Sequence, residues 1–213
     1  MADAAVALDA RTRDGVIAIA HAAAAAILDV YAGAFDVDRK ADASPVTAAD
    51  LAAHHVIVDG LRALTPDIPI VSEESAVVVP AGQRRAWTRM WLVDPLDGTT
   101  NFLHGIPHFA ISIALERDGQ IVAGVILNPA LDELYTAEKG GGAFLNDRRI
   151  RVAARQRINE MVFGTGMPFL GKGDHARFLY EMRHVMAECS GIPRIGAASL
   201  DLGYVAAGRF DGF

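Results

Sequence analysis

Residues 91–102, WLVDPLDGTTNF, constrain the fold and the chemistry of this chain more than any other stretch. Residues 90–93 are apolar and bulky, which favours a buried strand, and two aspartates three positions apart begin where this run ends. A glycine, two threonines and an asparagine follow, which is typical of a turn with accessible polar backbone. A buried strand that presents carboxylates at its tip, next to such a turn, predicts a metal ion beside a phosphate.

Asp94 and Asp97 are the predicted metal ligands. Carboxylate oxygens are hard ligands that suit Mg²⁺, which also takes water and phosphate oxygens. Two such ions held close together can activate a water molecule and stabilise a leaving oxygen. Gly98 allows backbone N–H groups to approach an anion closely. The alternative is an ordinary strand-to-helix turn, in which Asp and Gly are common, but the full string favours the metal site.

The charge and composition of the chain exclude several classes of partner. Its 213 residues carry a net charge of −6 with acids and bases mixed, so we expect no nucleic-acid partner. Cys189 is the single cysteine, which excludes an internal disulfide and fits a reducing, cytoplasmic location; we expect it to be a small buried hydrophobe. The longest apolar run, residues 16–28, is shorter than the roughly 20 residues that span a bilayer, so no membrane segment is expected.

Helical and strand patterns alternate along the chain. They predict helices over residues 4–34, 48–64, 175–189 and 199–207, a loop over 35–45, a connector over 77–85, and strands over 68–72, 90–93, 109–116, 121–127, 133–137, 149–152, 162–164 and 194–195. Thr47 is the expected N-cap of the second helix, and Asp-Gly at 118–119 and Asn-Asp at 146–147 predict turns. Helices, then a hairpin-rich sheet, then helices again indicate a layered α+β fold.

The aspartate string resembles the signature of the inositol monophosphatase family of Mg²⁺-dependent, lithium-sensitive phosphatases. Residues 94–102 match this signature in full, and the resemblance continues through LHGIPHF at 103–109, YTAEKG at 135–140 and GAASLD at 196–201. It covers the whole chain. It implies a layered α/β/α/β/α sandwich of the sugar-phosphatase type, one domain over residues 1–213, a homodimer, and a small phosphorylated metabolite as the partner.

The same resemblance implies roles for the residues of the string. Asp94 is expected to bridge two metal ions, and Asp97 and the carbonyl of Leu96 each to bind one. Backbone N–H groups of Gly98 and Thr99 are expected to hold the phosphate, and the Thr99 hydroxyl to orient the attacking water. Two small residues before the last predicted helix are expected to face the substrate hydroxyls: Gly196 and Ala198.

Residues outside the string are expected to join this site. By the resemblance, Glu73 is a metal ligand with a catalytic role and Glu74 is its neighbour, whereas the sequence alone would allow an exposed acidic loop. Asp50 is expected to accept a proton from the Thr99 hydroxyl, although an acid in the first turn of a helix also offsets the helix dipole. Lys40, beside Arg39, is either a site lysine or a solvated loop cation.

Two histidines near the string, His104 and His108, are expected to be structural. Mg²⁺ prefers oxygen ligands, and the predicted carboxylates supply them without help from imidazole. For Gly196 and Ala198, close packing of the chain is an alternative explanation for the small side chains.

The resemblance also implies that this domain is incomplete. Relatives continue past the segment at residues 209–213, with a glutamate that contacts substrate and a Trp-Asp motif whose aspartate completes the second metal site. We therefore expect weak or no activity from these 213 residues unless a partner supplies the missing part. Residues 40–69 are closer to the bisphosphate nucleotidase branch of the superfamily, so a chimera is an open alternative.

Taken together, the sequence predicts a Mg²⁺-dependent phosphomonoesterase. The expected substrate is myo-inositol 1-phosphate or a similar small polyol phosphate. A first alternative is hydrolysis of adenosine 3′,5′-bisphosphate. A second is a non-catalytic regulatory protein on the same fold, since bacterial relatives can contact transcription machinery.

Overall fold

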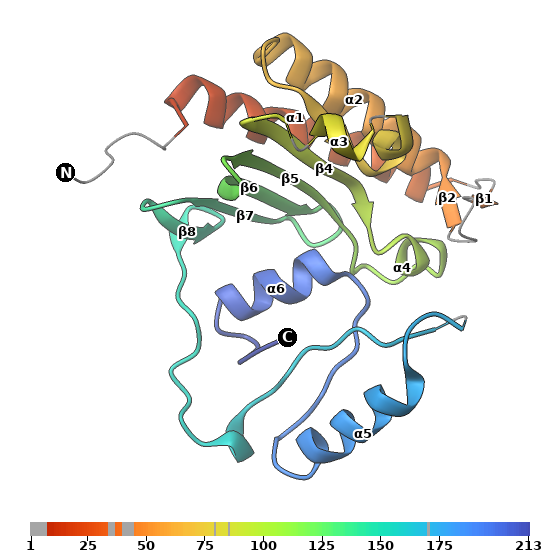
Figure 1. Cartoon of the computed structure of the whole chain (residues 1–213), viewed down its shortest axis with the longest axis vertical. Helices are drawn as coiled ribbons and strands as arrows, with labels where there is room; N and C mark the ends of the chain where they lie inside the picture. Colours follow the sequence, from red (N-terminus) through yellow and green to blue (C-terminus); the bar gives the residue numbers. More distant parts are fainter. Residues whose placement is uncertain (1–7, 34–36, 40–44, 79, 85, 170) are drawn as a thin grey trace.

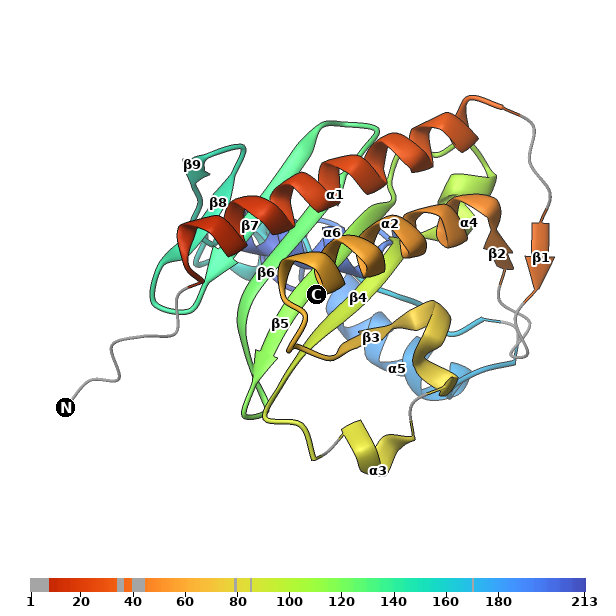
Figure 2. The same cartoon turned by 90° about the horizontal axis from the view of Figure 1, so that it is seen from above.

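The protein is a layered α+β sandwich in which helices cover both faces of one large sheet (Figure 1). The computed structural model describes residues 8–33, 37–39, 45–78, 80–84, 86–169 and 171–213. Helices α1 (Ala10–Tyr31) and α2 (Ala48–Leu64) lie side by side over one face, as Figure 2 also shows. Helix α6 (Ala198–Ala206) covers the other face. The predicted fold class is confirmed.

Seven consecutive strands form the sheet, and each pairs with the next one along the chain. Only the first pair, β3 with β4, is parallel; the others are antiparallel. The strands are β3 (Ile70–Ser72), β4 (Arg89–Asp97), β5 (Ala110–Arg117), β6 (Gln120–Asn128), β7 (Glu133–Glu138), β8 (Gly142–Leu145) and β9 (Arg148–Arg149). This order places the aspartate string at the end of an inner strand, β4.

Both predicted hairpin turns are confirmed. Asp118 and Gly119 have φ of 50° and 74°, and Asn146 and Asp147 have φ of 45° and 62°. Positive φ at both central residues matches the right-handed twist of the strands that the turn joins.

Side chains alternate between two cores across the sheet. On β6, Val125 and Leu127 belong to the large core under α1 and α2, whereas Ile126 packs toward α6. This alternation follows from the two-residue period of a strand. The middle strands β5, β6 and β7 are therefore covered on both sides, whereas the buried side chains of the motif strand β4 belong to the core under α1 and α2.

Helix α1 contributes a continuous apolar face to the larger core. Its buried residues recur with helical spacing: Val16, Ala20, Ala23, Ala24 and Ile27. By length and composition alone, α1 would also be long and apolar enough to cross a membrane, which is weak evidence because core helices pass the same test. Packing on α2 and the sheet accounts for this face.

Helix α2 begins as predicted. The Thr47 hydroxyl accepts a hydrogen bond from the Ala49 N–H, and the Asp50 carboxylate accepts one from the Thr47 N–H, which completes a capping box. The helix ends at Leu64, before Pro66.

A second, minimal β layer lies between α6 and helix α5 (His175–Met186) (Figure 1). Two parallel bridges form it in the described part of the chain: Val162 pairs with Gly191, and Phe163 with Gly212. The order of layers is thus α/β/α/β/α.

Several predicted boundaries were wrong. Residues 35–45 were predicted to be a loop, but β1 (Val37–Arg39) and β2 (Pro45–Thr47) pair in an antiparallel ribbon. Helix α1 begins at Ala10 because Asp9 caps the Thr12 N–H. The connector contains η1 (Glu73–Val78) and α3 (Ala81–Arg84).

Three further features of the structure differ from what the local sequence pattern predicted. Strand β8 was not predicted, since it begins with a glycine, Gly142, which weakens its pattern. Residues 194–195 form no strand. Cys189 is half-buried, with Sγ 3.7 Å from the Gly191 carbonyl oxygen, so it was wrongly predicted to be buried.

Candidate functional site

The aspartate string forms a sharp turn between β4 and the short helix α4 (Thr99–Leu103). Gly98 has φ of 90°, which residues with a side chain rarely adopt. A Cβ there would lie 3.0 Å from the His108 carbonyl oxygen and 3.1 Å from the Ala197 Cβ. Glycine is therefore needed for both the backbone conformation and the close approach of a neighbouring segment.

Asp94 lies next to Glu73 because of the strand register. Ser72 at the end of β3 pairs with Val93 on β4, so the residues that follow them are neighbours. Burial, and then the charges of Glu73 and Asp97, raise the pKa of Asp94 to about 8. Asp94 and Glu73 also share a hydrogen bond, and the Leu96 N–H donates to Asp94 Oδ1 at 3.1 Å. Two carboxyl groups this close cannot both ionise easily without a nearby cation.

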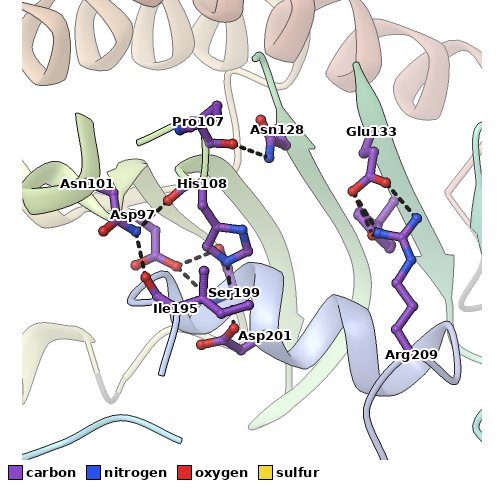
Figure 3. A network of polar contacts seen from close by, with 11 residues as sticks. Asp97, Asn101, Pro107, His108, Asn128, Glu133, Ile195, Ser199, Asp201 and Arg209 are labelled. Carbon is purple, nitrogen blue, oxygen red and sulfur yellow. Dashed lines mark hydrogen bonds and ion pairs between the residues drawn. The ribbon is translucent and has the colours of Figure 1, made fainter. Parts of the chain in front are cut away.

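Asp97 is oriented toward the start of α6 (Figure 3). Its Oδ2 accepts hydrogen bonds from the Ser199 N–H at 2.7 Å and from the Ser199 hydroxyl at 2.6 Å. Both donors use the same oxygen, so Oδ1 is not engaged by Ser199.

Asp50 and Thr99 are in direct contact, as predicted. The Thr99 hydroxyl lies 3.2 Å from Asp50 Oδ1 and 3.1 Å from the Leu96 carbonyl oxygen, so its single proton is shared between two acceptors. Asp50 Oδ2 accepts from both the N–H and the hydroxyl of Thr47 at 2.7 Å. Burial raises the pKa of Asp50, although hydrogen bonds from Thr47 and Thr99 oppose this shift. Asp50 thus caps α2 and also contacts the motif threonine.

The donor chemistry of this region fits a hard divalent cation. Glu73, Asp94 and Asp97 supply carboxylate oxygens, and Leu96 supplies a carbonyl oxygen, which are the ligand types that Mg²⁺ prefers. Burial is the main cause of the raised pKa of Asp94, and the negative charges of Glu73 and Asp97, which a cation would neutralise, add to it. Among the described residues, no group of three or more His, Cys, Asp or Glu side chains is close enough together to hold a metal ion as it stands.

The predicted substrate corner lies against the motif turn. Gly196 has φ of 99°, and Ala197 is fully buried against Gly98. The Asn101 side-chain amide donates to the carbonyl oxygens of His108, at 2.7 Å, and of Ile195, at 2.9 Å (Figure 3). Ala198, the first residue of α6, is exposed. The structure therefore brings the segment around Gly196 and Ala198 to the site.

The two histidines differ in environment. His104 is exposed, whereas His108 is buried with its Nε2 3.6 Å from Asp201 Oδ1. Neither of these two atoms has a hydrogen-bond partner among the residues that the structure describes. Burial lowers the pKa of His108, and burial together with the charge of Asp97 raises the pKa of Asp201 to about 6. Lys40 lies outside the described residues.

Two polar side chains in the site were not among the predicted site residues. Ser199 contacts Asp97 across 102 positions of sequence, and no local pattern marks it. His54 Nδ1 lies 2.8 Å from the hydroxyl of Ser72, which immediately precedes Glu73. His54 follows Asp50 by one helical turn, a spacing that could have suggested a shared face.

The fold and the site define a class: layered α+β proteins with a carboxylate cluster where a buried strand ends in an Asp-Gly turn. A sequence profile described as the inositol monophosphatase family matches residues 10–213, and the chain belongs to this family.

Comparisons with individual proteins support the same family assignment. The chain is 57% identical over 178 residues to an inositol-1-monophosphatase of Rhizobium meliloti (strain 1021), covering 83% of this chain and 65% of that protein. It is 43% identical over 179 residues to the Nus factor SuhB of Pseudomonas aeruginosa, again covering 83% and 65%. The crystal structure of extragenic suppressor protein suhB from Bartonella henselae matches with a TM-score of 0.82 at 46% identity, covering 93% of this chain and 75% of that one. The chain thus spans about two thirds of the length of the two curated relatives.

Proposed function

We propose that the protein is a Mg²⁺-dependent phosphomonoesterase acting on myo-inositol 1-phosphate or a similar small polyol phosphate. The observation that carries the proposal is the meeting of two groups of residues at one turn. One is the Glu73–Asp94 carboxyl pair with Asp97 nearby, and the other is the Thr99 hydroxyl bonded to buried Asp50. The name of the Rhizobium meliloti relative supports the choice of substrate.

Glu73, Asp94, Asp97 and the Leu96 carbonyl would hold the metal. When bound, Mg²⁺ supplies positive charge to a phosphate and lowers the pKa of a coordinated water. The chain's own part is to keep these oxygens close together against their mutual repulsion, which the β3–β4 register does for Glu73 and Asp94.

Asp50 and Thr99 act on the attacking water. The Thr99 hydroxyl donates its proton toward Asp50 Oδ1, which leaves the Thr99 oxygen as an acceptor for a proton of that water. Two hydrogen bonds from Thr47 to Oδ2 hold the Asp50 carboxylate, so its other oxygen stays directed at Thr99. The N–H groups at Gly98 and Thr99 are the proposed phosphate donors.

The experiment measures Mg²⁺ binding and phosphate release by the purified protein. We expect Mg²⁺ binding by calorimetry after treatment with EDTA, and its loss in Asp94→Asn, because the amide removes one negative charge from the cluster. Phosphate release from myo-inositol 1-phosphate should depend on Mg²⁺ and be lost in the same variant. Equal Mg²⁺ binding by the wild-type protein and Asp94→Asn would overturn the proposal.

Adenosine 3′,5′-bisphosphate is the alternative substrate within the same chemistry. Its support is the resemblance of residues 40–69 to the bisphosphate nucleotidase branch; of these residues, 40–44 lie outside the described ranges. A kcat/KM at least tenfold higher for adenosine bisphosphate than for inositol phosphate would establish this alternative.

A regulatory role is the second candidate, because a 43% identical relative is named a Nus factor. Under this role, Asp94→Asn would leave the cellular effect of the protein unchanged. Under the enzymatic role, the same variant would abolish that effect. A homodimer, a cytoplasmic location and the absence of nucleic-acid binding stay predictions; light scattering of the purified protein tests the first.

A further inference from the structure

We propose that Ser199 is a positioning residue for Asp97: from the start of α6 it holds one carboxylate oxygen and leaves the other available to a cation. The inference rests on the proposed function, since it concerns the same metal site. It assigns a role in the metal site to helix α6, which lies outside the aspartate string.

The first observation is the geometry of the contact between Ser199 and Asp97. The Ser199 N–H and hydroxyl both donate to Oδ2, at 2.7 and 2.6 Å, so this oxygen is held by two charge-assisted hydrogen bonds (Figure 3). A carboxylate held through one oxygen at two points cannot rotate freely. Its side chain therefore has one defined orientation before any cation binds.

The second observation is that α6 lacks a cap of its own. Its N-cap residue is Ala197, whose side chain makes no capping hydrogen bond. The Asp97 carboxylate takes the place of a cap residue by accepting the Ser199 N–H, although it is 102 positions away.

The third observation is that the backbone, and not the serine itself, fixes where Ser199 lies. Ala197 packs against Gly98, where a Cβ on the glycine would come within 3.1 Å of the Ala197 Cβ. Asn101 ties the motif turn to the Ile195 carbonyl oxygen. Residues 195–199 are thus docked to the turn at two points other than Ser199, and this docking places the serine hydroxyl next to Asp97.

The experiment compares Ser199→Ala with Ser199→Thr and with a matched control, Ser190→Ala. Ser190 also donates its hydroxyl in a 2.7 Å hydrogen bond, to the Asn159 carbonyl oxygen, but it lies away from the carboxylates. Three quantities are measured on the full chain: the Mg²⁺ dissociation constant by calorimetry, the melting temperature in EDTA, and kcat/KM for inositol phosphate where turnover is detectable.

We expect Ser199→Ala to weaken Mg²⁺ binding by about tenfold, which is the usual size of effect when a hydrogen bond to a metal ligand is removed. Ser199→Thr, which keeps the hydroxyl, should bind Mg²⁺ within about threefold of the wild-type protein. Ser190→Ala should bind Mg²⁺ as the wild-type protein does. A purely structural role would lower the melting temperature of Ser199→Ala without changing the dissociation constant, and that result would overturn the inference.

The outcomes separate this inference from the proposed function. If Asp94→Asn loses Mg²⁺ binding while Ser199→Ala retains it, only the role of Ser199 fails. If the wild-type protein binds no Mg²⁺, or Asp94→Asn binds it normally, the proposed function fails and the inference fails with it. Should Ser199→Ala not fold, Ser199→Cys replaces it with the same expected weakening, because a thiol is a poorer donor.

Discussion

Single carboxylates in this protein each serve two purposes. Asp50 caps α2 and contacts Thr99, and Asp97 caps α6 and belongs to the predicted metal site. Stability and activity are therefore coupled at these residues, and a variant is informative only when both are measured. Isosteric changes from Asp to Asn separate the two roles best, because they keep the shape of the side chain.

Asp50→Asn tests the proton-accepting role at Thr99. The amide retains an oxygen acceptor for the Thr47 N–H but carries no negative charge to draw the Thr99 proton. We expect kcat to fall by about 10²- to 10⁴-fold, the range typical of general-base residues, with Mg²⁺ affinity nearly unchanged. Activity within severalfold of the wild-type value, measured alongside the melting temperature, would leave Asp50 with only its capping role.

Asp201→Asn tests the buried His108–Asp201 pair through the pH dependence of stability. Burial and the charge of Asp97 raise the pKa of Asp201 to about 6, above its ordinary value of 3.8. The folded state therefore binds this proton more tightly than the unfolded state, and stability falls as pH rises from about 4 to about 6.

The Asn variant removes this ionisation. The stability of the variant relative to the wild-type protein, measured as the difference in the free energy of unfolding, should therefore be about 1 kcal/mol higher at about pH 8 than at about pH 4, after allowance for solvent screening. Urea denaturation in EDTA at the two pH values gives this difference. An identical difference between variant and wild type at both values would mean that Asp201 is not perturbed.

At the scale of elements, the site is a junction between the β4–α4 turn, the end of β3 and the start of α6. The parallel β3–β4 pair places Glu73 beside Asp94, and the close contact of Gly98 with Ala197 places α6 against the turn. Both contacts, the β3–β4 pairing and the packing of Gly98 on Ala197, require the two backbones to lie close together. The rigid sheet and the two helical layers that cover it keep these segments in place.

Gly98→Ala tests this junction. The added methyl group meets the His108 carbonyl oxygen at 3.0 Å, and the backbone φ of 90° is strained for alanine. We expect a loss of about 2–3 kcal/mol in the free energy of unfolding, together with weaker Mg²⁺ binding. Gly105→Ala is the matched control, because Gly105 has φ of 68° but nothing within 4 Å of its Cβ position. Equal effects of the two variants would show that backbone strain, and not the approach of α6, makes Gly98 necessary.

At the scale of the whole molecule, one ion pair and one backbone hydrogen bond to Asp211 hold the last residues of the chain to earlier segments. Arg155 donates to both oxygens of Asp211 at 2.8 and 2.9 Å, and Asp211 also accepts the Val162 N–H at 2.8 Å. These contacts join residues about 50 positions apart in sequence. They connect the chain segment after α6 to the strand-like segment at residues 162–163.

Asp211→Asn tests this connection through pH. The hydrogen bond from Arg155 lowers the pKa of Asp211 below 3.8, so its contribution to stability is present above that pH and is lost as pH falls through the folded-state pKa. We expect the variant to melt below the wild-type protein at neutral pH and the gap to narrow as the pH falls below 3.8. Arg177→Gln, which breaks an exposed pair with Glu181 on α5, should have little effect at either pH and serves as the control. A gap that persists in acid would rule out the carboxylate charge as its cause.

Particular residues show which structural features could be predicted from short stretches of sequence. The capping box at Thr47 and Asp50 spans four positions, and each hairpin turn spans two, so short-range chemistry was enough to predict them. Strand β1 was missed because it pairs with β2, and pairing between two three-residue strands leaves no periodic pattern in the sequence. The order of polar residues in the aspartate string was enough to predict a metal site. The contact between Asp50 and Thr99, which are 49 positions apart, was expected only because of the resemblance to the inositol monophosphatase family.

The sequence by itself therefore determined the cap of α2, the two hairpin turns, the α+β class and the residue types at the site. Only the tertiary structure decided that Glu73 meets Asp94, that Asp97 is held by Ser199, and that Gly98 must admit Ala197. The physical reason is range: the cap of α2 and the two hairpin turns are set by hydrogen bonds within a few residues, whereas these contacts depend on strand register and on the packing of α6 against the sheet. That packing is a cooperative property of the whole chain, so no single segment encodes it.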